Sequence, residues 1–136
     1  MKLRKWIAVS SATAALSLFA APHAQAGPGE WDDLGYRHFY DDGADYYPYR
    51  TSAVKSGGGN FKVCINTAST GDGPQDIYIL EEDDPGYPDT PVGEYLYEPG
   101  CWVFRNIGSF VDGSNHRAEF YIRTNDPSAM SVHYYD

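Results

Sequence analysis

An aromatic and acidic stretch near the amino-terminal end carries side chains that could recognise a partner. Five tyrosines fall within fourteen residues: Tyr36, Tyr40, Tyr46, Tyr47 and Tyr49. Tyrosine is a rigid amphipathic contact in protein recognition, and flat rings also stack on sugars. Asp41, Asp42 and Asp45 lie among the rings and could set a charge preference. The alternative is that the tyrosines cover the core while the aspartates face water.

A second candidate recognition surface lies near the carboxyl-terminal end. Tyr121, His133 and Tyr135 fall on the same side of two alternating segments, with Glu119 and Arg123 beside them. This side could form a flat patch that contacts a partner. The alternative is ordinary cross-strand pairing on a solvated surface, which contributes about 0.2–1 kcal/mol per pair.

The acidic run at 81–84, with Asp89 close by, raises the question of a calcium site. Calcium takes six to eight oxygen ligands, but this spacing matches no EF-hand loop. We therefore interpret the run as a solvated loop and expect that folding does not require calcium. Three histidines follow residue 26, His38, His116 and His133, and they show no metal-ligand spacing. No metal site and no cofactor are predicted.

Signatures of catalysis are missing from the sequence. It contains no G-x-S-x-G, no H-E-x-x-H, no G-x-x-x-x-G-K-[ST] loop and no G-x-G-x-x-G. A pair of carboxylates could serve a glycosidase, but nineteen acidic residues offer no basis for choosing two. We therefore predict a protein that is not an enzyme.

The amino terminus has the pattern of a cleavable Sec-type signal peptide. Three basic residues come first: Lys2, Arg4 and Lys5. An uncharged apolar run over 7–21 follows, and Ala24-Gln25-Ala26 is an A-x-A cleavage site. We expect residues 1–26 to be removed, so that the secreted protein begins at Gly27.

The charge that remains after this cleavage is strongly acidic. The signal peptide holds three of the ten basic residues and none of the nineteen acidic ones, so seven minus nineteen leaves −12. Such a charge argues against nucleic acid and anionic membranes as partners. No second apolar run is long enough to span a bilayer.

Two regions of different composition follow the signal peptide. Residues 27–60 are rich in Tyr, Asp and Gly, with few aliphatic side chains, and we predict an irregular lead-in with one edge strand near 50–55. Residues 61–136 alternate between apolar and polar positions, with Gly, Pro and Asp between the runs. This pattern predicts an all-β fold, a small antiparallel β-sandwich. Strands are expected at 61–66, 76–81, 94–98, 101–107, 117–124 and 130–135.

The last two predicted strands are expected to form a hairpin across 125–129. A register that pairs Ile122 with Val132 also pairs Phe120 with Tyr134. The same register puts Tyr121 beside His133 on the outer side. A slip of one residue would place apolar residues opposite polar ones on both sides, which favours this pairing.

The two cysteines, Cys64 and Cys101, allow a single intramolecular pairing. Each lies on the side of its strand opposite the stronger apolar set, so the two strands are expected to be joined on one side. Neither belongs to a C-x-x-C motif, and export exposes both to oxidising conditions. The sequence therefore predicts a structural disulfide.

Together these features predict a secreted, non-catalytic recognition protein that binds an extracellular protein or glycan. Two alternatives stay open: a structural or surface-associated exported protein, and an inhibitor of an extracellular hydrolase. A glycan-binding module should show coplanar exposed tyrosines in a groove. A protein-binding factor should show a rigid loop or a large apolar patch, and a structural protein should show a long open edge strand.

Overall fold

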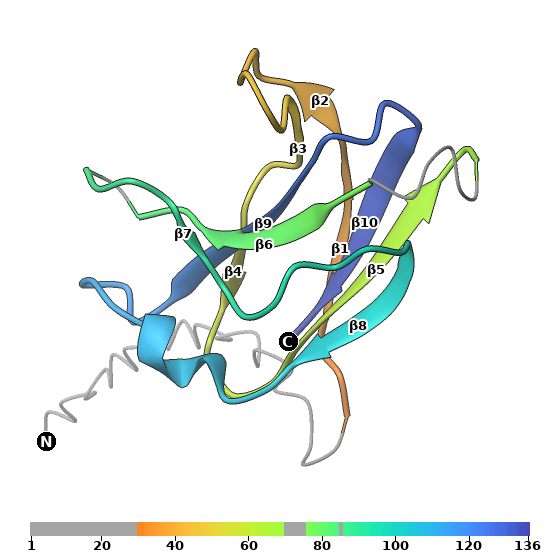
Figure 1. Ribbon diagram of the computed structural model, residues 1–136. Helices are drawn as coiled ribbons and strands as arrows, with labels where there is room; N and C mark the ends of the chain where they lie inside the picture. Colours follow the sequence, from red (N-terminus) through yellow and green to blue (C-terminus); the bar gives the residue numbers. More distant parts are fainter. Residues whose placement is uncertain (1–29, 70–75, 85) are drawn as a thin grey trace, which may run out of the picture.

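The computed structural model describes residues 30–69, 76–84 and 86–136. These residues form ten strands and one short 3-10 turn (Figure 1). Every strand pairing among them is antiparallel, which confirms the predicted all-β class. The predicted signal peptide over 1–26 lies outside the described residues.

One sheet has four strands in the order β1-β10-β5-β8. Their bounds are β1 Asp33–His38, β10 Ala129–Tyr135, β5 Phe61–Thr67 and β8 Gly100–Phe104. In β5, the apolar residues Phe61, Val63 and Ile65 are buried, while Lys62 and Cys64 between them are partly exposed. This period of two fixes the register, because a slip of one residue would turn the apolar set outward.

The other sheet has six strands in the order β2-β3-β9-β6-β7, and β4 also pairs with β9. Their bounds are β2 Tyr40–Asp41, β3 Tyr49–Arg50, β4 Val54–Ser56, β6 Tyr78–Glu82, β7 Thr90–Pro91 and β9 Ala118–Thr124. The 3-10 turn η1 covers Ile107–Phe110. Strand β9 is central, because β3, β4 and β6 all pair with it.

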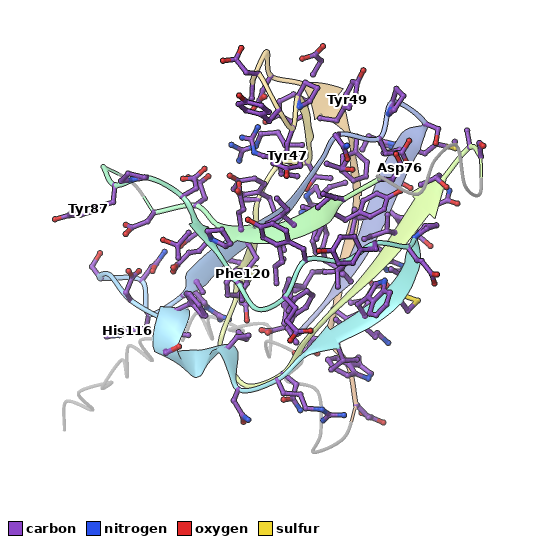
Figure 2. All side chains as sticks on the ribbon, in the orientation of Figure 1. Tyr47, Tyr49, Asp76, Tyr87, His116 and Phe120 are labelled. Carbon is purple, nitrogen blue, oxygen red and sulfur yellow. A yellow bond between two sulfur atoms is a disulfide. The ribbon has the colours of Figure 1, made fainter. Side chains whose placement is uncertain are left out.

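Apolar side chains from both sheets meet in one core. Phe61 of β5 and Phe120 of β9 are fully buried, and their ring centroids lie 5.0 Å apart. Figure 2 shows Phe120 among the crowded side chains in the middle of the molecule. Each such ring contributes about 1.5–3 kcal/mol through burial, so this contact is a main source of cohesion between the sheets.

The predicted disulfide between Cys64 and Cys101 is confirmed. The two residues are direct register partners on β5 and β8. Their sequence separation is 37, and closing a loop of this length stabilises a domain by roughly 4 kcal/mol in the chain-entropy model. The bond therefore fixes β8 to the rest of its sheet.

The predicted hairpin of β9 and β10 is wrong, because these strands belong to different sheets (Figure 1). Strand β9 pairs with β3, β4 and β6, whereas β10 pairs with β1 and β5. Phe120 and Tyr134 still both face the core, but they do so from opposite sheets. Alternation identifies the residues that share a buried side, yet it does not distinguish a neighbouring strand from a strand across the core.

The described part of the lead-in expected over 27–60 contains four strands, where the sequence predicted an irregular segment with one edge strand. Strand β1 lies there and pairs with β10 over five residues, from Asp33 to His38. Strands β2, β3 and β4 follow, the last two near the edge strand expected at 50–55. These segments need few aliphatic residues because they add to sheets whose cores other strands supply. The strand expected at 94–98 is reduced to one bridge between Leu96 and Tyr78.

Candidate functional site

The solvent side of the four-stranded sheet brings together three residues predicted from the sequence to bind a partner. Tyr36 of β1 is the register partner of His133 of β10, and Asp33 pairs with Tyr135. On the other side of β10, Lys62 of β5 pairs with Tyr135. Because direct partners in an antiparallel sheet point to the same side, these side chains form a continuous row across three strands.

The rings in this row are in contact with one another. The ring centroids of Tyr36 and His133 are 3.9 Å apart, and those of His133 and Tyr135 are 4.2 Å apart. The Nζ atom of Lys62 lies 4.0 Å from the ring centroid of Tyr135 and 4.8 Å from that of Trp31. We call this row of Trp31, Tyr36, Lys62, His133 and Tyr135 the aromatic face.

Hydrogen bonds hold the imidazole of His133 in place at both nitrogens. Its Nε2 lies 2.6 Å from Oδ1 of Asp33, and its Nδ1 lies 2.8 Å from the hydroxyl of Tyr135. The bond with His133 lowers the pKa of Asp33, which stays ionised and accepts a hydrogen bond from the Nε2–H group. Burial raises the pKa of Tyr135, as do the nearby Tyr36 and Asp33, and its hydroxyl is hydrogen-bonded to Nδ1 of His133. Together these bonds fix the orientation of the His133 and Tyr135 rings.

The other tyrosines of the amino-terminal stretch belong to the six-stranded sheet. Tyr40 and Tyr49 lie on β2 and β3, and Tyr46 and Tyr47 lie between these strands. Figure 2 shows Tyr47 and Tyr49 at this end of the molecule. Tyr46 is 84% exposed, whereas Tyr47 and Tyr49 are half-buried. The structure therefore separates the predicted set, since Tyr36 lies on the other sheet.

The prediction of Tyr121 as part of an exposed patch is wrong, because its side chain is fully buried. The guanidinium carbon of Arg50 lies 3.6 Å from the centroid of its ring, and that of Arg123 lies 5.7 Å away. Its hydroxyl contacts the carboxylates of Glu81 and Asp89. Burial, followed by these two bonds, raises the pKa of Tyr121. The outer side of a central strand is covered by side chains from its neighbours, which alternation alone does not indicate.

The acidic run at 81–84 begins within β6, whose last residue Glu82 is buried, so the prediction of a solvated loop is wrong there. The run faces arginines from other strands. Arg123 lies 3.2 Å from Glu81 and 2.7 Å from Asp42. Arg50 lies 3.7 Å from Asp83 and 3.9 Å from Asp89. Sequence reasoning missed this role of the arginines, although Arg123 follows Tyr121 by two residues and so had to share its side of β9.

No group of three or more His, Cys, Asp or Glu side chains in the described ranges is placed to hold a metal ion. Within the same ranges, no helix has the length and apolar character to cross a membrane.

A second feature that sequence reasoning missed is an open groove beside β8, with a volume of about 390 Å³. Its mostly apolar lining comes from the segment before β8, from β8 itself and from η1, and includes Val92, Tyr95, Leu96, Trp102, Phe104 and Ile107. Trp102 is 36% exposed at the groove. The sequence does contain an indication of this groove. The run Cys101 to Phe104 follows a Pro-Gly turn and is apolar on both sides of its strand.

Comparison with known proteins identifies relatives but names no activity. The family model described as the YndA coiled coil domain matches residues 33–134. The uncharacterized protein YndA of Bacillus subtilis (strain 168) is 41% identical over 114 residues, which cover 82% of this chain and 77% of that protein. No solved structure matches the chain. Although the family description names a coiled coil, the described residues of the matched range form strands and a 3-10 turn.

Proposed function

The chain belongs to the family described as the YndA coiled coil domain, and we propose that it is an exported, non-catalytic recognition protein. In this proposal a signal peptide over 1–26 directs secretion, and the two sheets pack as a β-sandwich. The aromatic face is the surface that contacts a partner outside the cell. The observation that supports it most is the row of rings in mutual contact on the solvent side of the four-stranded sheet.

The contacts within the row favour a protein over a glycan as the partner. A sugar stacks on the free face of an aromatic ring, as base and cation ligands do. Here Tyr36 and Tyr135 lie against His133, and Lys62 lies over the rings of Tyr135 and Trp31. Protein interfaces instead use rigid aromatic anchors beside charged groups on a flat surface.

Tyr36 is the anchor that this arrangement offers. It is 62% exposed, while contact with His133 already fixes its ring at 3.9 Å. A ring that is ordered before binding loses little side-chain entropy on association. His133 and Tyr135 are half-buried and serve mainly to support it.

The experiment uses protein recovered from culture medium as bait, after its amino terminus has been sequenced. The proposal predicts that the secreted protein starts at Gly27. It also predicts that the bait captures one extracellular protein, in a constant molar ratio to the bait. Tyr36→Ala should weaken capture by roughly 10-fold or more, as expected for an anchor residue. Tyr46→Ala is the matched control, because Tyr46 is more exposed but lies outside the aromatic face.

Three results would contradict the proposal. A secreted form that retains Met1 would contradict cleavage. Loss of capture with Tyr46→Ala but not with Tyr36→Ala would move recognition to the end of the six-stranded sheet. Specific binding to purified cell-wall polysaccharide, with no protein captured, would show that the partner is a glycan.

A further inference from the structure

The disulfide continues a row of directly paired residues that crosses the whole four-stranded sheet. Tyr36 of β1 pairs with His133 of β10, which in turn pairs with Cys64 of β5. Cys64 pairs with Cys101 of β8 and is bonded to it. Direct partners in an antiparallel sheet point to the same side, so the disulfide lies on the solvent side, next to the aromatic face. Cys101 is exposed and Cys64 is partly buried, so the bond is accessible to thiols in solution.

The two sulfur atoms of this bond differ in their access to an attacking thiol. A thiolate approaches a disulfide sulfur from the side opposite the sulfur that leaves. Beyond Cys101 lies the edge of the sheet, where no other described strand pairs with β8. Beyond Cys64 lies β10, where the ring of His133 is packed against two tyrosines. The approach to Cys101 is therefore open, whereas His133 covers the approach to Cys64.

The surroundings of Cys64 favour its departure as a thiolate. Lys62 precedes Cys64 by two residues on β5 and therefore shares its side of the sheet. The acidic Asp33 on this side lies two strands away, on β1, and is hydrogen-bonded to His133. Nearby cations lower the pKa of a cysteine thiol, and a thiol of lower pKa leaves a disulfide faster. Cys64 is therefore the better leaving group.

We propose that the Cys64–Cys101 disulfide is a thiol-exchange site, at which a small extracellular thiol forms a mixed disulfide with Cys101. The thiolate of the small molecule attacks Sγ of Cys101 from the open edge of β8. The new sulfur–sulfur bond forms as the Cys64–Cys101 bond breaks, and the bonding electron pair leaves on Sγ of Cys64. One disulfide and one thiolate are consumed and one of each is formed, so the step involves no net oxidation.

The modification is reversible, because Cys64 stays close to the mixed disulfide while β5 remains paired with β10. Attack of the Cys64 thiolate on Sγ of Cys101 expels the small thiol and restores the native bond. Closing the loop again favours the native disulfide at equilibrium. The amount of adduct therefore follows the concentration of the thiol. The exchange is measured without a binding partner, so it and the proposed recognition function can each fail alone.

Brief exposure of the native protein to 2-mercaptoethanol, followed by alkylation with N-ethylmaleimide, tests the site of attack. A protease that cuts after glutamate separates the cysteines, because four glutamates lie between them: Glu81, Glu82, Glu94 and Glu98. Mass spectrometry should find the mercaptoethanol adduct on Cys101 and the alkyl group on Cys64. An adduct mainly on Cys64, or equally on both, would overturn the proposal. Exchange that occurs only at urea concentrations that unfold the chain would also overturn it.

His133→Ala and His133→Phe are a matched pair that tests the cover over Cys64. Alanine removes the ring, so the adduct should then appear on both cysteines. Phenylalanine keeps a ring at this position and should leave the adduct on Cys101. Circular dichroism and the melting temperature of each variant show that the sheets are intact. An adduct that stays confined to Cys101 in folded His133→Ala would overturn the assignment of His133 as the cover.

Lys62→Gln tests the charge near the leaving group. It should slow the exchange by roughly two- to fivefold, because a leaving thiol of higher pKa departs more slowly. Lys55→Gln is the matched control, since Lys55 is exposed on β4 of the other sheet and the change removes the same charge. Its exchange rate should equal that of the wild type. Equal rates in the two variants would overturn the role of Lys62, because only the overall charge would then matter.

Discussion

Buried hydroxyl groups explain part of the tyrosine content of the chain. Three tyrosines are almost completely buried: Tyr78, Tyr121 and Tyr134. The hydroxyl of Tyr134 lies 2.6 Å from Oγ1 of Thr51 and accepts a 2.9 Å bond from the backbone N–H of Ile122. Tyr78 donates to Asp126 at 2.6 Å. Burial raises the pKa of all three, so they remain neutral donors. These rings belong to the folded framework and are not available to a partner.

Glu82 is a buried carboxyl whose replacement should stabilise the protein. It is 9% exposed, and its pKa is raised chiefly by burial and further by Asp112, Asp84 and Glu119. A raised folded-state pKa favours folding below the unfolded pKa of about 4.3, and this contribution is lost as the pH rises through the folded value. Glu82→Gln should therefore melt at a higher temperature than the wild type at neutral pH.

The pH dependence separates this electrostatic effect from a change in packing. The advantage of Glu82→Gln should shrink as the pH falls through the raised folded-state pKa and should be absent below about 4, where the carboxyl is neutral in both the folded and the unfolded wild type. Thermal melts followed by circular dichroism at several pH values measure the difference. The exposed Glu94 supplies the control substitution, Glu94→Gln, which should leave the melting temperature nearly unchanged. An advantage that is independent of pH would show that packing causes it.

At the scale of elements, strand existence could be predicted more easily than strand pairing. Strands β5, β9 and β10 lie where alternation predicted them, because each has one buried side. The link between β9 and β10 was misread as a hairpin turn. It is instead a corner at which the chain changes sheets, organised by Asp126, which is 1% exposed. Strand β1 was missed because it is stabilised by pairing with β10, far away in the sequence.

Asp126 should be the most sensitive position in this corner. Its carboxylate accepts bonds from the backbone N–H and the hydroxyl of Ser128, both at 2.7 Å, and from Tyr78. Asp126→Ala would leave the buried Tyr78 hydroxyl without an acceptor, at a cost of about 1–3 kcal/mol, and the loss of the charged acceptor adds to this. Urea unfolding measures the loss. Asp126→Asn keeps one acceptor oxygen and should lose less, whereas equal losses would show that the charge itself is required.

At the scale of the whole molecule, the sequence predicted only fragments of the candidate site. Tyr36, His133 and Tyr135 were each predicted, but in two separate groups. Their contact depends on the pairing of β1 with β10, which joins residues about 100 positions apart. The sequence around Trp31 and Lys62 did not indicate that they belong to the aromatic face, because each joins it only through contact with side chains of other segments. Such a surface is a property of the topology, and periodicity within one segment does not reveal it.

The distribution of charge over the whole molecule bears on calcium. The chain has a formal net charge of −9, and acidic residues concentrate at the end of β6 and just after it. Glu81 contacts Arg123, and Asp83 and Asp89 each lie within 4 Å of Arg50. A cation that bound there would have to displace arginine from these carboxylates. The folded protein therefore neutralises much of the charge on this acidic surface with its own basic side chains.

Thermal melts of the wild type in chelator and in about 1 mM calcium should therefore nearly coincide. A site with a dissociation constant of about 0.1 mM would add about 1.4 kcal/mol at that concentration, a shift of several degrees. Arg50→Gln is the informative comparison, because it frees Asp83 and Asp89 without adding a carboxylate. A calcium-dependent rise confined to this variant would show that Arg50 occupies the position a cation could take. The same rise in the wild type would show that calcium competes successfully with arginine, and the loop after Glu81 would then be a binding site.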